Sequence, residues 1–110
     1  MKNEILNAIK YLDIDMSNVG TYHDLYEEIN YNGTVHEIVD GYIDIYYYDL
    51  RKWAVDNWEY VEDANEQGIG TNGIDYHKDI QAGQYLKFEQ MAVEIIEEIF
   101  NEQEFQEVKK

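Results

Sequence analysis

The stretch from Lys87 to Glu102 reads KFEQMAVEIIEEIFNE, and it decides the class of fold. Its apolar residues recur every three or four positions, which is the spacing of one face of an α-helix; they are Phe88, Met91, Ala92, Ile95, Ile96 and Ile99. Its carboxylates fall on the other faces, at Glu89, Glu94, Glu97, Glu98 and Glu102. We therefore predict an amphipathic helix from about Lys78 to Phe105, with an apolar stripe against a core and an acidic outer surface.

The same spacing predicts two short helices near the N-terminus. The segment Asn3 to Leu12 carries apolar residues three and four positions apart: Ile5, Leu6, Ile9 and Leu12. Thr21 is a suitable N-cap, with Asp24 three residues further on as in a capping box. The helix that follows is predicted to run to about Tyr31 and to bury Leu25 and Ile29.

The central part of the chain is mostly helical in pattern. Asn32-Gly33 indicates a turn, and Thr34 is a candidate cap for a helical region from Val35 to about Tyr60 with a possible break at Gly41. Tyr42 to Tyr48 is β-branched or aromatic in part, so it fits either a helix or a strand. Val61 to His77, which contains Gly68, Gly70 and Gly73, is predicted to be a long loop.

Together these segments predict an all-α protein. We expect four to five helices around one small core, elongated and acidic, in a single domain covering residues 1–110. The absence of Pro agrees with long helices, because Pro is a common cause of helix breaks.

The most unusual property of the chain is its charge. Twenty-four Asp and Glu face eight Lys and Arg, which gives a net charge of −16 in 110 residues. Disordered acidic chains have few aromatic residues, whereas this one has eleven Tyr, two Trp and three Phe. The composition therefore indicates a folded body with a strongly negative surface.

This charge is similar in density to that of DNA. A duplex carries one negative charge per roughly 1.7 Å of its axis, so sixteen charges correspond to about 27 Å of duplex. A compact domain of this length has a radius of gyration of about 13 Å and hence a similar long dimension. The comparison motivates the hypothesis that the surface imitates nucleic acid and occupies a protein that binds it.

The carboxylates recur at spacings that place them together on helix faces. Glu37, Asp40 and Asp44 are three and four residues apart, and Glu94, Glu98 and Glu102 follow at steps of four. We predict that the following residues stand in for phosphates: Asp24, Glu27, Glu28, Glu37, Asp40, Asp44, Asp49, Asp56, Glu59, Glu62, Asp63, Glu94, Glu97, Glu98 and Glu102.

Two simpler explanations of the charge remain open. One is an ordinary solvated acidic surface, although soluble helices usually interleave charges of opposite sign because like charges four residues apart are destabilising. The other is adaptation to high salt, which would favour fewer large apolar residues than the thirteen Ile of this chain.

Composition also bounds the compartment and the chemistry. The chain has no Cys, which excludes disulfides and cysteine nucleophiles and fits a reducing cytoplasm. Met1 to Lys10 lacks the apolar run of a signal peptide, and no apolar stretch approaches the roughly 20 residues that cross a bilayer. Nucleic acid and anionic lipid should both be repelled, so we expect basic protein surfaces as partners.

Four partial motifs carry less weight. Gly68 to Gly73 satisfies G-x-G-x-x-G but lacks the surrounding βαβ pattern, so we interpret it as a flexible loop. His36 to Asp40 is similar to a zinc-protease helix but has no third ligand in register. Asp13-x-Asp15-x-Ser17 and Asp63-x-Asn65 begin like calcium loops without completing one. We expect no cofactor, no metal site and no catalytic residues.

The central segment resembles a known family. The short motifs Asp24-Leu25, His36-Glu37-Ile38-x-Asp40 and Ile45-Tyr46-Tyr47-Tyr48-Asp49-Leu50, followed by Ala54, resemble the Ocr-type antirestriction proteins of T7-like bacteriophages over about Thr21 to Glu104. The resemblance implies an all-helical, dimeric DNA mimic that fills the DNA groove of type I restriction-modification enzymes. By position it assigns Asp24, Glu37, Asp40, Asp44 and Asp49 to the phosphate-like array. The sequence departs from the family at Asp44, where a Pro is expected, and in its less acidic end at Lys109-Lys110.

The leading hypothesis is therefore a DNA-mimic inhibitor of a host defence enzyme, acting in the cytoplasm of an infected bacterium. An anti-CRISPR protein, or another acidic adaptor that binds a DNA-binding protein, is the alternative. Trp53 and Trp58 are predicted to form a dimer contact, because Trp suits surfaces that are apolar at one end and wet at the other.

Overall fold

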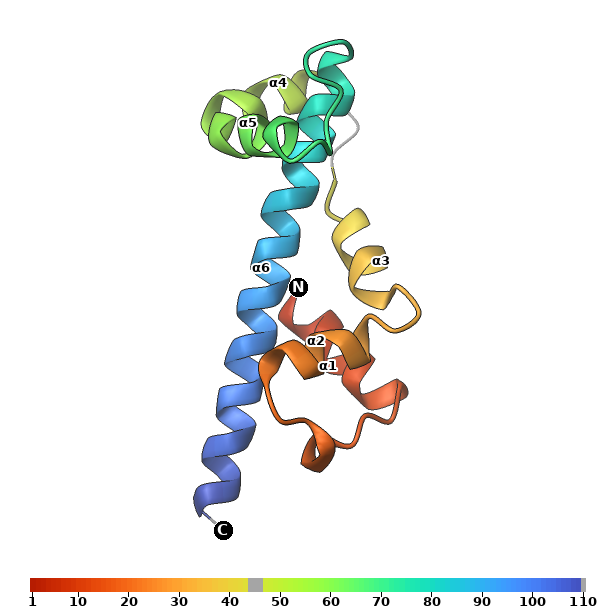
Figure 1. Cartoon of the computed structure of the whole chain (residues 1–110), viewed down its shortest axis with the longest axis vertical. Coiled ribbons are helices and arrows are strands. Elements are labelled where there is room, and N and C mark those ends of the chain that lie inside the picture. The colour runs from red at the N-terminus through yellow and green to blue at the C-terminus, as the bar shows by residue number, and fades with distance from the viewer. Residues whose placement is uncertain (44–46, 110) are drawn as a thin grey trace. The chain divides into compact units, whose positions relative to one another are not determined.

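In the part of the chain that it describes, the computed structural model consists of helices joined by turns and loops, with no strand (Figure 1). It describes residues 1–43 and 47–109, with side chains for residues 1–43 and 51–102. The α-helices in these ranges are α1 (Lys2–Tyr11), α2 (Tyr22–Ile29), α3 (Thr34–Asp40), α4 (Tyr47–Asp56), α5 (Trp58–Glu66) and α6 (Tyr76–Lys109), and a short 3-10 helix, η1, spans Met16–Asn18. The all-α prediction is confirmed for the described residues. They hold six α-helices rather than the predicted four to five, because the chain breaks at Asn57 between α4 and α5.

The chain forms two compact units. Unit 1 contains Met1–Val39 and Glu89–Lys110, and unit 2 contains Asp40–Phe88. Fourteen carboxylates and four lysines give the sequence of unit 1 a net charge of −10, while ten carboxylates and four basic residues give that of unit 2 a net charge of −6. The acidic character of the sequence is therefore shared by both units.

The core of unit 1 lies where α1, α2 and α3 pack beside the second half of α6 (Figure 1). Leu25 and Ile29 of α2 are fully buried, as predicted. The Thr21 side chain accepts a hydrogen bond from the Asp24 backbone N–H at 3.1 Å, which confirms the predicted N-cap. The other buried apolar residues of this unit are Ile5, Ala8, Val35, Val39, Ala92, Ile96 and Ile99.

Two apolar positions assigned to helix faces are more exposed than the periodicity suggested. Leu6 of α1 is 42% exposed, because the buried face of that helix runs through Ile5 and Ala8 instead. Met91 of α6 is 38% exposed, beside the fully buried Ala92. In both helices two adjacent apolar residues lie at the edge of the apolar face, and the packing of the core buries only one of them.

The turn between α2 and α3 differs from the prediction in its cap. Helix α2 ends at Ile29 rather than near Tyr31, and Gly33 takes a positive φ of 81°, a conformation that glycine adopts without steric cost. Thr34 is the buried first residue of α3 rather than its cap. The Asn30 side chain instead accepts from the Val35 N–H at 3.1 Å. A residue of the preceding turn therefore supplies the acceptor for a backbone N–H group in the first turn of α3.

In unit 2 the predicted loop from Val61 to His77 is too long. Helix α5 continues to Glu66, because Val61 and Ala64 are three residues apart and both are buried, and no glycine occurs before Gly68. The irregular segment is residues 67–75, and α6 begins at Tyr76, slightly earlier than predicted. The end of α6 lies at Lys109, beyond the predicted Phe105.

The alternative of helix or strand for Tyr42 to Tyr48 is resolved only at its ends. Tyr42 lies in the turn after α3, next to the expected break at Gly41, whereas Tyr47 and Tyr48 open α4, so the helix alternative is confirmed for those two residues. Residues 44–46 lie outside the described residues. Among the described helices none combines the length and the apolarity needed to span a membrane.

Candidate partner-binding surface

Every predicted phosphate-like carboxylate with a described side chain lies at the surface. These thirteen exposed residues, hereafter the acidic set, are Asp24, Glu27, Glu28, Glu37, Asp40, Asp56, Glu59, Glu62, Asp63, Glu94, Glu97, Glu98 and Glu102. The remaining two, Asp44 and Asp49, fall outside the described side chains. The acidic set is distributed over α2, α3, α4, α5 and α6.

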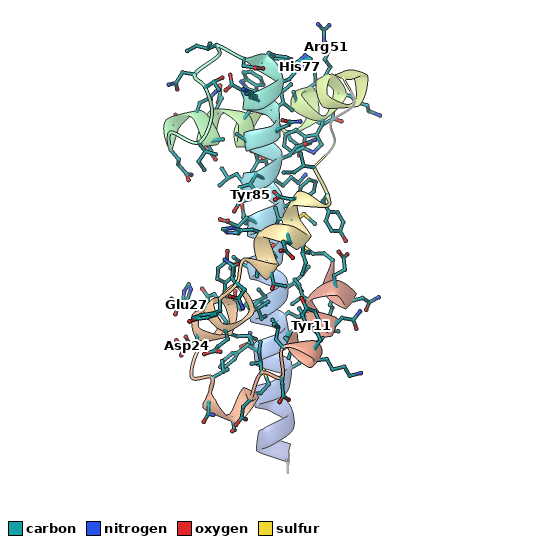
Figure 2. All side chains as sticks on the ribbon, turned by 90° about the vertical axis from the view of Figure 1, so that its right-hand side faces the viewer. Tyr11, Asp24, Glu27, Arg51, His77 and Tyr85 are labelled. Atoms are coloured by element: carbon teal, nitrogen blue, oxygen red, sulfur yellow. The ribbon has the colours of Figure 1, made fainter. Side chains whose placement is uncertain are left out.

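On α2 the carboxylates sit on one side of a short, well-capped helix. Asp24 and Glu27 are three residues apart and therefore neighbours on the helix surface. Figure 2 shows both side chains on the same side of α2, pointing away from the ribbon. Because Leu25 and Ile29 bury the opposite face, this acidic face is fixed by the core.

On α5 an exposed tryptophan is followed by several exposed carboxylates. Glu59, Glu62 and Asp63 lie within its first two turns and are exposed. The Trp58 indole Nε1 donates to Glu62 Oε1 at 2.8 Å, one helical turn further along. This part of the surface therefore combines an aromatic ring with several carboxylates.

Lys2 of α1 partly compensates the charge of the carboxylates on α6. Lys2 Nζ lies 3.0 Å from Glu98 Oε1 and 3.4 Å from Glu102 Oε1. The hydrogen bond that Lys2 donates to Glu98, together with the charges of both glutamates, raises the pKa of Lys2 above its ordinary value. A shallow surface hollow beside it is lined by Glu94, Glu97, Glu98, Asn101 and Glu102. Glu94 and Glu97 thus form the less compensated part of this face.

The two tryptophans lie in different surroundings. Trp53 is partly buried and packs against the buried pair Ala54 and Ile80. Trp58 is 47% exposed. Trp53 therefore contributes to the core of unit 2, whereas Trp58 is available at its surface; the dimer contact assigned to both stays a prediction.

The Gly-rich segment is held by a buried carboxylate that the sequence analysis missed. Asp79, in the first turn of α6, is only 3% exposed. It accepts from the N–H and the hydroxyl of Thr71, and from the Gly73 N–H at 2.6 Å. Gly68 to Gly73 lies in the irregular segment between α5 and α6, as the loop interpretation expects, and Asp79 anchors its Thr71 and Gly73 backbone N–H groups. An Asp in the first turn of a helix, next to a Thr- and Gly-rich loop, was the available sequence signal.

Burial and hydrogen bonding act in opposite directions on this carboxyl. Burial alone would raise the pKa of Asp79, because it disfavours the charged form. The hydrogen bonds from Thr71 and Gly73 outweigh burial and hold the pKa below the ordinary value of 3.8. Asp79 is therefore a structural anion within unit 2 and does not belong to the exposed acidic set.

The remaining partial motifs have local structural partners. Asp15 accepts from the Ser17 N–H at 3.0 Å and caps η1. His36 Nε2 lies 3.8 Å from Glu89 Oε2 at the surface. Within the described ranges, no three His, Asp or Glu side chains are grouped closely enough to hold a metal ion.

Comparison with known proteins found no matching protein family, no matching curated protein and no matching solved structure.

Proposed function

We propose that this protein is a DNA mimic that inhibits a DNA-binding protein by occupying its nucleic-acid groove. The observation that carries the proposal is the exposure of all thirteen residues of the acidic set on a chain of net charge −16. Solubility of a small domain needs a net charge of only about 2 to 8. A larger charge destabilises the compact state by self-repulsion, so a functional reason for it is expected.

The proposed mechanism is competition for cationic side chains. Carboxylates at steps of four residues on a helix are about 6 Å apart along its axis, which is similar to the spacing of phosphates along a strand. They meet the Lys and Arg that otherwise contact phosphate, and opposite fields speed the encounter. The partly compensated Glu98 and Glu102 contribute less than the α2 and α5 carboxylates, because Lys2 already pairs with them.

The resemblance of the central segment to Ocr-type proteins selects the target. We place a type I restriction-modification enzyme first and a CRISPR effector complex second, in the cytoplasm of an infected bacterium. A homodimer is proposed on the same resemblance. No catalytic role is proposed for any residue.

A direct test measures inhibition of DNA binding by a purified type I restriction enzyme. Duplex DNA and this protein should compete for one site, and the affinity of the protein should fall steeply between about 50 and 200 mM salt, as does the affinity of Lys- and Arg-rich grooves for DNA phosphates. Affinity that is insensitive to salt, or binding that excess DNA fails to displace, would contradict the mechanism.

A pair of variants with the same net charge separates position from charge. The triple substitution D24N, E27Q and E28Q removes three charges from the acidic set on α2. The matched control, E4Q, D13N and E66Q, removes three charges outside it. Mimicry predicts a clearly larger loss of inhibition for the first triple, whereas equal losses would mean that only bulk charge matters.

A further inference from the structure

We propose that Trp58 is an arginine-binding anchor, on which a guanidinium group of a basic protein partner stacks while the surrounding α5 carboxylates supply the counter-charge. For the identity of that partner, a DNA-binding protein, the inference rests on the proposed function. It adds an aromatic contact that a phosphate backbone does not offer.

The first observation is the exposed apolar surface at the junction of α4 and α5. Val55 is 80% exposed and Trp58 is 47% exposed, three residues apart across the junction. Trp53, by contrast, packs against buried residues of the same unit. A large aromatic side chain left half in water, near a second exposed apolar residue, is typical of a contact surface.

The second observation is that the indole is held in place before any partner arrives. Its Nε1 donates to Glu62 at 2.8 Å, so the ring is restrained against α5. The preceding residue, Asn57, is fixed as well, because its side-chain amide donates to the Trp53 carbonyl at 3.0 Å and accepts from Lys87 Nζ at 2.6 Å. A contact residue that is already ordered loses less conformational entropy on binding.

The third observation is the charge around the ring. Asp56, Glu59, Glu62 and Asp63 are all exposed and lie within five residues of Trp58. A second copy of the chain would bring the same carboxylates against them and be repelled. A cation is attracted both by these carboxylates and by the face of the indole. Charge complementarity therefore selects a basic partner over a second copy.

Arginine fits this surface better than lysine. The guanidinium group is planar, stacks on aromatic faces and binds carboxylates through two parallel N–H donors, whereas the lysine ammonium is a strongly hydrated point charge. The hydrogen bond from Nε1 to the Glu62 carboxylate also polarises the indole, which strengthens the attraction of its face for a cation.

The test uses the full-length protein and two dye-labelled peptides of equal length, one with four arginines spaced by Gly and Ser and the other with four lysines. Fluorescence anisotropy should show tighter binding of the arginine peptide. Trp58→Leu should weaken that binding about tenfold, the factor expected from a partly desolvated cation–π contact. Trp58→Phe should retain part of the affinity, and circular dichroism checks that each variant keeps its helices.

A charge-matched pair tests the role of the carboxylates. E59Q with E62Q should weaken binding of the arginine peptide more than E4Q with E66Q, although both pairs remove two charges. Equal binding of the two peptides, together with no effect of Trp58→Leu, would overturn the proposal in favour of bulk charge. A wild-type dimer that Trp58→Leu converts to monomers in analytical ultracentrifugation would overturn it in favour of a second copy.

These outcomes are separable from those of the proposed function. Peptide binding requires no restriction enzyme. If the protein binds the arginine peptide but does not compete with DNA, the anchor proposal is supported and the DNA-mimic proposal is contradicted. The opposite result would be competition with DNA that Trp58→Leu leaves unchanged, together with no preference for the arginine peptide. That result would support the DNA-mimic proposal and contradict the anchor proposal.

Discussion

Lys87 Nζ donates a hydrogen bond of 2.6 Å to Asn57 Oδ1 and thereby joins α6 to the junction of α4 and α5. The same ammonium lies 5.9 Å from the centre of the Trp53 ring and 5.6 Å from that of Tyr60, within the range of cation–π contacts. Asn57 in turn donates to the Trp53 carbonyl and so satisfies the end of α4. One of the few basic residues of this acidic chain is therefore used inside unit 2 to hold a helix break.

Replacing Lys87 by Met should destabilise the protein by about 1–3 kcal/mol. The substitution keeps the aliphatic stem but removes the hydrogen bond to Asn57 and both ring contacts, leaving a part-buried amide oxygen without its donor. Urea denaturation should show a lower midpoint. The matched control is Lys78→Met. Lys78 is exposed, and its Nζ lies 4.0 Å from Asp75 Oδ2, a long and solvent-screened ion pair. This substitution should change the free energy of unfolding by less than about 0.5 kcal/mol. Equal effects of the two substitutions would contradict the structural role of Lys87.

Replacing Asp79 by Asn should loosen the segment from residue 67 to 75 and change the response to acid. In Asp79, Oδ1 accepts from Thr71 and Oδ2 accepts from the Gly73 N–H; Asn keeps only one acceptor oxygen, so one set of donors would face an NH2 group, and a loss of about 1–3 kcal/mol is expected at neutral pH. Because folding lowers the pKa of Asp79, its stabilising effect is present above the unfolded value near 3.8 and is lost as pH falls through the lower folded value. The difference in unfolding free energy between wild type and Asp79→Asn should therefore shrink below about pH 4. A difference that stays constant from pH 7 to pH 2 would show that the carboxylate charge plays no part.

Gly83→Ala should be destabilising, although alanine normally stabilises a helix interior by about 0.5–1 kcal/mol relative to glycine. A Cβ at position 83 would lie 2.9 Å from the Cα, N and Cγ2 atoms of Val61, two of which belong to the backbone. Overpacking of this kind costs about 1–3 kcal/mol. The sign of the change in thermal unfolding temperature is the measurement, and a stabilised variant would mean that α5 and α6 pack less closely than described.

Thr21→Ala should cost about 1 kcal/mol of stability, because the first N–H groups of α2 lose the acceptor that Thr21 provides. Thr21→Ser keeps the hydroxyl and should remain close to wild type in the same urea titration. Similar losses for the two variants would indicate that the threonine methyl group, and not the cap, is responsible.

Local chemistry made part of the fold predictable. Thr21, Leu25 and Ile29 were assigned correctly because capping and helical spacing act over a few residues of one helix. The exposure of the acidic set followed in the same way, since carboxylates are rarely buried without partners. Asp79 is an exception because the Thr71 N–H, the Thr71 hydroxyl and the Gly73 N–H all donate to it. These groups lie in a loop six to eight residues earlier, and helical periodicity does not predict contacts of that kind.

The sequence by itself determined that the chain is helical and carries an excess of carboxylates, because periodicity and ionisation are properties of residues and their near neighbours. The tertiary structure alone decided which tryptophan is buried and which is exposed. Trp53 and Trp58 are alike in type and similarly placed in the pattern, but Ala54 and Ile80 pack against the first, and the break at Asn57, held by Lys87, presents the second to water. That outcome depends on contacts up to thirty residues apart, which only packing brings together.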